Sequence, residues 1–346
     1  MKLLPLLILL AQTPDDVGRL QSAQQLVQQG RGAEAVTALA ELAAKFPRSP
    51  EIRFFLGSAL GQAGRLPEAI EHLRIATELD PKFQPGFRVL GMFRVQSGNF
   101  LPETRGALEK AVDLGPADGR ARYWLGRFLL ETRSPASAKA QFEESLRLQP
   151  DSTPARLGYA LALEGTGDTD AALTQFEAVL ANEPGSAPAL LGRARCLYRK
   201  QQFEPALESA LEARDKGAET QDRRGLLWIL SRLYRALGRD KEAEAAERQL
   251  AEVEAGFNQK LARFRDLVEQ AMQFRREGNR RMVVETLELA LKLEERQDAL
   301  VMLGDTYVEL GRLADAERCF VRANQAGPES AAITLRLQHL RARLGK

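Results

Sequence analysis

One pattern recurs along almost the whole chain, and it constrains the fold more than any other feature. Seven times an apolar, helix-periodic stretch ends at a glycine, and an alanine, threonine or valine follows five or six positions later. The glycines are Gly30, Gly64, Gly98, Gly167, Gly238, Gly278 and Gly311, and the residues that follow them are Ala35, Ala69, Thr104, Ala172, Ala243, Val283 and Ala316. Two further units carry Arg133 and Gln201 at the glycine place, with Ala138 and Ala206 after them. Nine units result, and a period near 34 residues predicts stacked helical repeats rather than one globular core.

Each unit has the residues that a pair of helices requires. In residues 50–80 the apolar positions recur at helical spacing on both sides of Gly64. Gly64 can adopt the left-handed conformation that ends the first helix, and Ala69 allows the second helix to approach the first closely. Pro81 cannot continue the second helix. Closing prolines stand at Pro47, Pro81, Pro116, Pro150, Pro184 and Pro328.

These units resemble tetratricopeptide repeats. The family's pattern falls in the second unit on Leu56, Gly57, Leu60, Gly64, Ala69, Leu73, Ala76 and Pro81, and in the ninth on Leu303, Gly304, Tyr307, Gly311, Ala316, Phe320, Ala323 and Pro328. The resemblance covers residues 16–330 and implies an all-α fold, an α-solenoid of about nine stacked helix-turn-helix units. Residues 331–346 are expected to add a C-terminal capping helix, because Ile333, Leu337 and Leu340 share one face.

The array is expected to have one irregular joint. Residues 240–276 contain no proline and a single mid-run glycine, Gly256. They can form one long helix or two helices that meet near Gly256, and we favour the break. We therefore divide the chain into repeats 1–7 over residues 12–257, repeats 8 and 9 over residues 258–330 after the joint, and the cap.

The amino terminus, Met1–Ala11, has one lysine, an apolar run and a final small residue. The run is too short to span a bilayer, and it resembles a short secretory signal peptide. We expect export to a periplasmic or other extracytoplasmic space and no transmembrane span in the mature chain. The alternative is a cytoplasmic protein in which this segment begins the first helix.

The residues that most enzymes and metal sites need are scarce. The chain has 2 Cys and 2 His, and these residues form no zinc-binding pattern. Phosphate-loop, dinucleotide-binding and nucleophile-elbow motifs are absent from the sequence. We expect no enzyme activity, no metal, no cofactor and no small-molecule substrate.

The resemblance also implies where a partner would bind. In this family, partners usually lie against the first helices and touch positions 2, 5, 9, 12 and 13 of each unit. In repeats three to eight these thirty positions hold ten Arg, no Lys and the two acids Glu131 and Glu164. With 38 Arg in 346 residues, random placement would give about three, so codon bias in a GC-rich genome does not account for the excess. The candidate partner-binding residues are Arg88, Arg120, Tyr123, Arg127, Arg195, Tyr198, Arg199, Trp228, Arg232, Arg235, Arg265, Arg275 and Arg276.

Arginine with aromatic side chains can bind carboxylates in a bidentate manner and stack on planar groups. We therefore expect a non-enzymatic scaffold that binds an acidic, extended polypeptide. Two alternatives remain: a polyanion or nucleic-acid binder that uses the same residues, and a regulatory subunit of an enzyme complex. A formal net charge of +2 argues against nucleic acid. A further alternative is a solvated helix face whose aromatic side chains pack between repeats.

Overall fold

The computed structural model describes residues 14–218, 220, 222–327 and 330–344. Met1–Ala11 and Pro328 therefore lie outside the described residues, and the expectations about the leader and the last closing proline are untested. Within the described ranges the ordered elements are helices. The chain divides into two compact units: unit 1 comprises Met1–Pro116 and Arg265–Lys346, and unit 2 comprises Ala117–Phe264.

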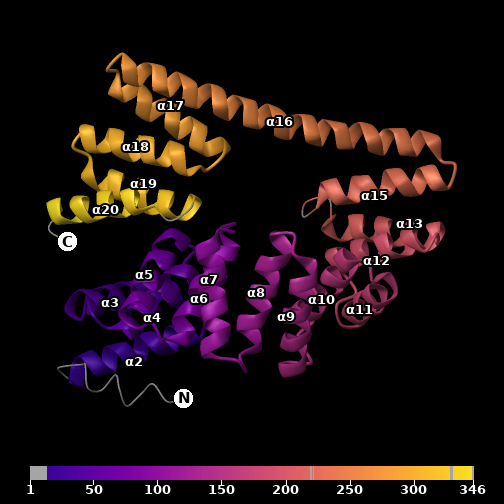
Figure 1. The fold of residues 1–346 in the computed structure, drawn as a ribbon, viewed down its shortest axis with the longest axis horizontal. Helices are drawn as coiled ribbons and strands as arrows, with labels where there is room; N and C mark the ends of the chain where they lie inside the picture. Colours follow the sequence, from indigo (N-terminus) through magenta and orange to yellow (C-terminus); the bar gives the residue numbers. More distant parts are fainter. Residues whose placement is uncertain (1–13, 219, 221, 328–329, 345–346) are drawn as a thin grey trace. The chain divides into compact units, whose positions relative to one another are not determined.

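Unit 1 contains three complete helix pairs from the amino-terminal half and a second group of helices from the carboxyl-terminal end (Figure 1). The first group is α2 (Pro14–Gln28), α3 (Gly32–Lys45), α4 (Pro50–Gln62), α5 (Leu66–Leu79), α6 (Gln84–Gln96) and α7 (Pro102–Leu114). The second group is α17 (Arg280–Leu293), α18 (Gln297–Glu309), α19 (Leu313–Ala326) and α20 (Ala331–Arg343).

Unit 2 repeats the same helix-pair plan. Its elements are α8 (Gly119–Glu131), α9 (Pro135–Leu148), α10 (Thr153–Thr166), α11 (Thr169–Asn182), α12 (Ala187–Arg199), α13 (Phe203–Ala213), the π-helical turn η1 (Arg214–Ala218) and α15 (Arg223–Ala236). Adjacent first helices pack on one another, α8 on α10, α10 on α12 and α12 on α15. The first-helix side is therefore the tighter side of this stack.

The turn chemistry predicted for the nine units is confirmed. All seven glycines, together with Arg133 and Gln201, have φ between 57° and 86°, in the left-handed region. The nine residues that follow them, from Ala35 to Ala316, are each 0% exposed. Small side chains at these places let the two helices of a pair meet closely, and larger ones would hold them apart.

Close approach also explains glycines within the first helices. A Cβ on Gly192 would lie 2.2 Å from the Phe176 ring, and one on Gly304 would lie 2.7 Å from the Phe320 ring. Phe176 and Phe320 are among the largest fully buried side chains. In these two second helices, α11 and α19, the aromatic ring thus packs against the bare backbone of a first helix.

The joint differs from the favoured expectation. Asp240–Arg276 form one continuous helix of 37 residues, α16, so the predicted break near Gly256 is wrong. Helix propagation continues because residues 240–276 contain no proline, and Gly256 costs only about 1 kcal/mol relative to alanine within a helix. One helix therefore serves both as the second helix of repeat seven and as the first helix of repeat eight. The sequence-based division at residues 257 and 258 stays a prediction, and it falls inside α16.

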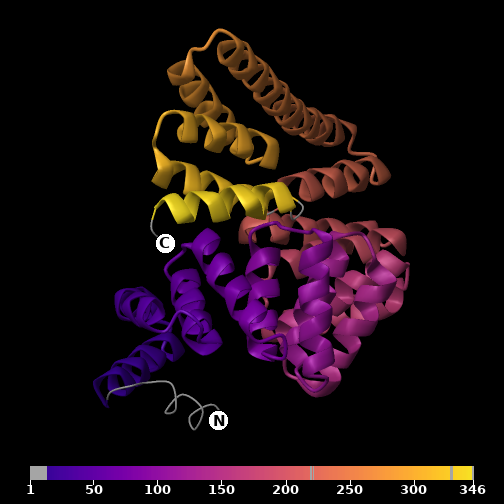
Figure 2. The same cartoon turned by 60° about the vertical axis from the view of Figure 1, so that its left-hand side comes forward.

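The capping helix is present. Ile333, Leu337 and Leu340 of α20 are buried, and α20 packs on α19. Within unit 1, α19 also contacts α5, and both views place the yellow carboxyl-terminal helices beside α5 (Figure 1, Figure 2). This contact joins repeat nine to repeat two, and the repeat pattern did not predict it.

Candidate functional site

Nine of the predicted partner-binding residues lie in unit 2, all on the first helices α8, α12 and α15. We call these nine the first-helix surface: Arg120, Tyr123, Arg127, Arg195, Tyr198, Arg199, Trp228, Arg232 and Arg235. The other four belong to unit 1. Arg88 lies half-buried on α6, and Arg265, Arg275 and Arg276 lie on the last part of α16. The thirteen residues are thus divided between the two units.

In the middle of the first-helix surface, Arg195 forms an ion pair with a residue of the same unit. Arg195 donates from Nε and Nη2 to the two carboxylate oxygens of Glu164 on α10, at 2.6 and 2.7 Å. Arg199 donates to the Glu164 main-chain carbonyl at 3.0 Å and lies 3.7 Å from its carboxylate. Burial lowers the pKa of Arg195, but the hydrogen bonds and charge of Glu164 outweigh burial and raise that pKa above its ordinary value. Arg195 is therefore a structural partner of Glu164 before any ligand binds.

The α8 end of the surface combines a guanidinium with stacked aromatic rings. Arg127 donates to the Tyr123 hydroxyl at 3.2 Å, and its ion pair with Glu131 is long, at 3.9 Å. The Tyr123 ring meets the rings of Trp124 and Phe142 edge to face. These contacts fix the ring of Tyr123 and leave Arg127 only loosely neutralised.

A pocket of about 490 Å³ opens beside this end of α8. Arg120, Tyr123 and Trp124 line one side, and the segment 149–154 that leads into α10 lines the other. The Arg120 guanidinium has no hydrogen-bond or ion-pair partner among the described residues. Trp124 is not among the predicted partner-binding residues, although it lines this pocket. A pair of adjacent aromatic residues next to an arginine was the available sequence signal.

The α15 end presents an aromatic ring and a cation to solvent. Trp228 is 40% exposed, although most large apolar side chains of the unit are buried. The guanidinium carbon of Arg232 lies 4.7 Å from the centre of its ring. Arg235 instead pairs with Glu247 of α16, at 2.8 and 2.9 Å. Trp228 and Arg232 therefore form a stacked pair that a ligand can reach, whereas Arg235 is held within the unit.

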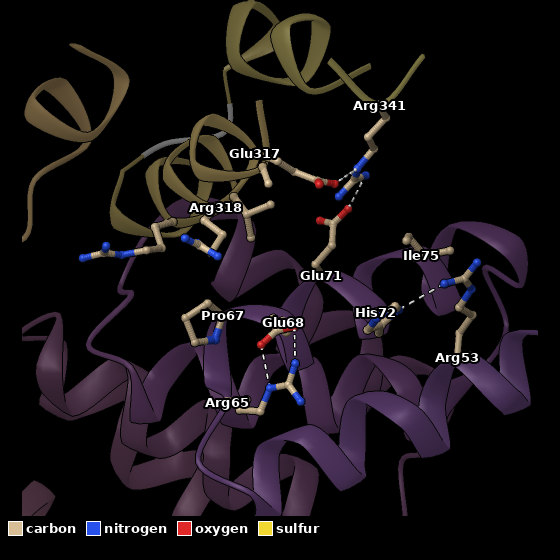
Figure 3. A pocket seen from close by; sticks show the side chains of 13 residues that line it. Arg53, Arg65, Pro67, Glu68, Glu71, His72, Ile75, Glu317, Arg318 and Arg341 are labelled. Atoms are coloured by element: carbon tan, nitrogen blue, oxygen red, sulfur yellow. Dashed lines mark hydrogen bonds and ion pairs between the residues drawn. The ribbon is translucent and has the colours of Figure 1, made fainter. Parts of the chain in front are cut away.

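Unit 1 has a separate cleft, of about 750 Å³. Its walls come from α4, α5, α19 and α20, and Figure 3 shows the side chains that line it. Arg341 of α20 donates to the carboxylate of Glu71 on α5 and to that of Glu317 on α19, both at 2.9 Å. Burial raises the pKa of Glu71, but Arg74 and Arg341 outweigh it, so the pKa falls to about 2.

On the α4 side of the cleft, Arg53 contacts a histidine. One Nη of Arg53 lies 3.1 Å from Nδ1 of His72 (Figure 3). Burial, followed by the charge of Arg53, lowers the pKa of His72 to about 4. His72 is therefore neutral near pH 7, and Nδ1 accepts the hydrogen bond from Arg53.

Other reactive groups are shielded. Cys196 and Cys319 are both buried, and burial raises the pKa of each thiol to about 11. In the described part of the chain, histidine, cysteine and acidic side chains form no cluster that could hold a metal ion. Among these same residues, each helix is too short or too polar to cross a membrane.

Two models of a known protein family match segments of the chain that contain the repeat pattern. Residues 20–82, 95–153, 129–187 and 157–219 match a family model described as a tetratricopeptide repeat. Residues 297–328 match a second model with the same description.

Individual proteins resemble parts of the chain. The aspartyl/asparaginyl beta-hydroxylase of Mus musculus is 30% identical over 155 residues, which cover 42% of this chain and 21% of that protein. The chain therefore matches about a fifth of the length of this relative. The solved structure of PilW, a type IV pilus biogenesis factor, is 20% identical, with a TM-score of 0.50 over 58% of this chain and 91% of that one. YrrB, described as a TPR protein with an unusual peptide-binding site, is 25% identical, with a TM-score of 0.46 over 55% of this chain and 96% of that one. At this identity, the PilW likeness concerns the fold alone.

Proposed function

The chain belongs to the tetratricopeptide repeat family, whose fold suggests a scaffold for protein–protein interaction, and from this premise we propose that the first-helix surface of unit 2 binds an extended acidic polypeptide. The observation that carries the proposal is the exposed pair of Trp228 and Arg232 on a first helix, in which the guanidinium carbon of Arg232 lies 4.7 Å from the centre of the Trp228 ring. A solvent-exposed tryptophan under a guanidinium is the kind of anchor that dominates protein interfaces. The chain's own role is binding, and any catalysis belongs to a partner.

Charge on this surface favours an acidic ligand. Six arginines stand among its nine residues, and only Glu131 and Glu164 oppose them at the corresponding first-helix positions. Glu164 neutralises one charge of the Arg195 and Arg199 pair, and Glu131 lies 3.9 Å from Arg127. Arg120 and Arg232 therefore carry the charge that is freest to meet carboxylates.

Aromatic side chains at both ends favour an extended segment rather than a compact one. The pocket of Arg120, Tyr123 and Trp124 lies on α8, and Trp228 with Arg232 lies on α15, so repeats five and six separate the two anchors within unit 2. A strand or loop with acidic residues near each end and apolar side chains between them fits this arrangement.

Charge reversal of the two free arginines tests the proposal. The full chain is titrated with a fluorescent peptide rich in Glu and Leu, and binding is followed by anisotropy. We expect Arg120→Glu with Arg232→Glu to weaken binding at least about tenfold, equivalent to ~1.4 kcal/mol. Arg195 is left in place, because a glutamate there would face the buried Glu164 and disturb the fold.

A matched control carries the same charge change outside the first helices of unit 2. Arg147→Glu with Arg214→Glu alters two exposed arginines on α9 and η1. We expect this variant to bind within about twofold of the native chain. Equal losses in both variants would mean that net charge, not the first-helix surface, governs binding. Tighter binding to single-stranded RNA than to the peptide, with a steep salt dependence, would favour the polyanion alternative.

Export is a separate proposal that rests on Met1–Ala11 alone. Amino-terminal sequencing of the chain purified from its native cell tests it. A mature chain that begins at Gln12 supports export, and a retained Met1 in a cytosolic fraction contradicts it.

A further inference from the structure

The cleft in unit 1 is lined by residues that are not part of the first-helix surface. Its volume of about 750 Å³ lies in the range of small-molecule sites. Its walls are the second helices α5 and α19, with Arg53 from α4 and Arg341 from α20. All of these elements belong to unit 1.

Most cations that line the cleft already have a carboxylate partner. Arg341 pairs with Glu71 and Glu317, Arg65 with Glu68, Arg322 with Glu295, and Arg318 with Asp315. The two Arg341 pairs join α20 to α5 and α19, and all of these pairs leave little charge for a ligand.

Arg53 is different. Its hydrogen bonds go to the Pro47 carbonyl, at a long 3.5 Å, and to Nδ1 of His72, at 3.1 Å. Among the described residues, no carboxylate lies within ion-pair distance of it. Glu71, a buried acid on α5, already pairs with Arg74 at 3.0 Å and with Arg341 at 2.9 Å. Burial and the like charge of Arg341 lower the pKa of Arg53, so its cation is held at an electrostatic cost. A bound anion would relieve that cost.

The rest of the lining is apolar. Pro67 and Ile75 from α5 face the cleft together with Ala314 and Val321 from α19. Figure 3 places Arg53, His72 and Ile75 side by side on one wall. A ligand with an acid group at Arg53 can therefore place a hydrocarbon body between α5 and α19.

We propose that this cleft binds a small amphipathic carboxylate, whose acid group pairs with Arg53 and whose apolar body packs between α5 and α19. Because one wall belongs to repeat two and the other to repeat nine, the ligand bridges the two ends of the array within unit 1. Binding then stabilises the docked arrangement by mass action.

Calorimetric titration of the full chain with hexanoate tests the site, and inorganic phosphate is the second probe. We expect saturable binding of hexanoate and at least about tenfold weaker binding of phosphate, because phosphate lacks the apolar body. Equal affinity for both probes would overturn the proposed packing of a hydrocarbon body. Absence of saturable hexanoate binding would overturn the site.

Variants at Arg53 separate binding from folding. We expect Arg53→Gln to weaken hexanoate binding at least about tenfold. Arg53→Lys should weaken it less, since lysine keeps the positive charge but lacks the planar guanidinium that donates two hydrogen bonds to one carboxylate. Arg105→Gln, on α7 outside the cleft, is the matched control and should bind like the native chain. Thermal unfolding without ligand shows whether each variant is folded. A folded Arg53→Gln chain that binds hexanoate normally would overturn the role of Arg53.

A second readout distinguishes this cleft from the first-helix surface. Hexanoate should raise the unfolding temperature of the native chain and leave that of Arg53→Gln unchanged. The Arg120→Glu with Arg232→Glu variant should bind hexanoate normally, because both substitutions lie in unit 2. Loss of hexanoate binding in that variant would contradict an independent cleft.

Discussion

The guanidinium of Arg341 lies 2.9 Å from the carboxylate of Glu71, 270 positions earlier in the chain. Gln325 and Asn99 add two further long-range hydrogen bonds. The side-chain amide of Gln325 donates to the Pro67 main-chain carbonyl, and the side-chain amide of Asn99 donates to the main-chain carbonyl of Gln325. A capping helix normally only covers the apolar end of a stack. Here the cap and the helix before it also bond to repeats two and three.

The Glu71–Arg341 pair should contribute measurably to stability. Glu71 is buried and keeps Arg74 when Arg341 is removed, so we expect Arg341→Met to cost about 1–2 kcal/mol rather than the larger penalty of a bare buried charge. Urea unfolding of Arg341→Met, Glu71→Gln and the double variant gives the coupling energy, expected at about 0.5–1.5 kcal/mol. Arg281→Met, which removes an exposed pair with Glu285, is the control and should cost under about 0.5 kcal/mol. A coupling energy near zero would show that the contact adds nothing to stability.

Acid should destabilise the cleft region in two steps. The folded pKa of His72 is about 4 against an ordinary 6.5, so its contribution is complete above pH 6.5 and is lost as the pH falls towards 4. Burial, Arg53 and Arg341 lower this pKa, and Glu71 and Glu68 partly oppose them. The folded pKa of Glu71 is about 2 against 4.5, so its contribution is lost between pH 4.5 and 2.

The measurement is the urea midpoint as a function of pH. We expect a fall between pH 6.5 and 4, worth up to about 2–3 kcal/mol at ~1.4 kcal/mol per pKa unit. His72→Gln keeps an acceptor for Arg53 and should flatten this part of the curve, and Glu71→Gln should flatten the part below pH 4.5. A native midpoint that is constant from pH 7 to 4, or that rises on acidification, would contradict this assignment.

Local chemistry made much of the fold predictable, and long-range pairing did not. The left-handed turns at Gly64, Arg133 and Gln201 follow from a period that any repeat of this kind must keep, and the structure has all three. By contrast, no periodic pattern links Glu71 to Arg341, because a contact between repeat two and the cap depends on how every intervening pair is rotated.

The candidate site was predictable only in part. Repeat positions identified Arg120, Trp228 and Arg232 on first helices. They could not reveal that Arg195 already forms a salt bridge with Glu164, since that pairing depends on the rotamers of side chains on two different helices. Arg53 and His72 lie outside the positions that the resemblance implies, so no sequence pattern predicts their contact.

The left-handed turns allow a test with opposite signs. A Cβ on Gly64 meets no atom within 4 Å, so only its φ of 76° opposes a side chain. We expect Gly64→Ala to lower stability by about 1 kcal/mol. Gln201→Gly, at a φ of 61°, should raise stability by about 0.5–1 kcal/mol, because it removes strain from an exposed residue. Both are measured by urea unfolding, and a shift of the same sign in the two variants would refute the common backbone conformation.

The continuity of α16 is testable at Gly256. This residue lies inside a 37-residue helix, and a Cβ there meets no atom within 4 Å. Alanine is the better helix former by about 1 kcal/mol, so we expect Gly256→Ala to raise stability by about 0.5–1 kcal/mol. Gly106→Ala, in the middle of α7 with the same open surroundings, should give a similar gain and serves as the reference. The sequence alone favoured a break at Gly256. If such a break placed this glycine in the left-handed conformation, Gly256→Ala would instead lower stability as Gly64→Ala does. The sign of one substitution, read by urea unfolding, therefore decides between a continuous helix and a joint.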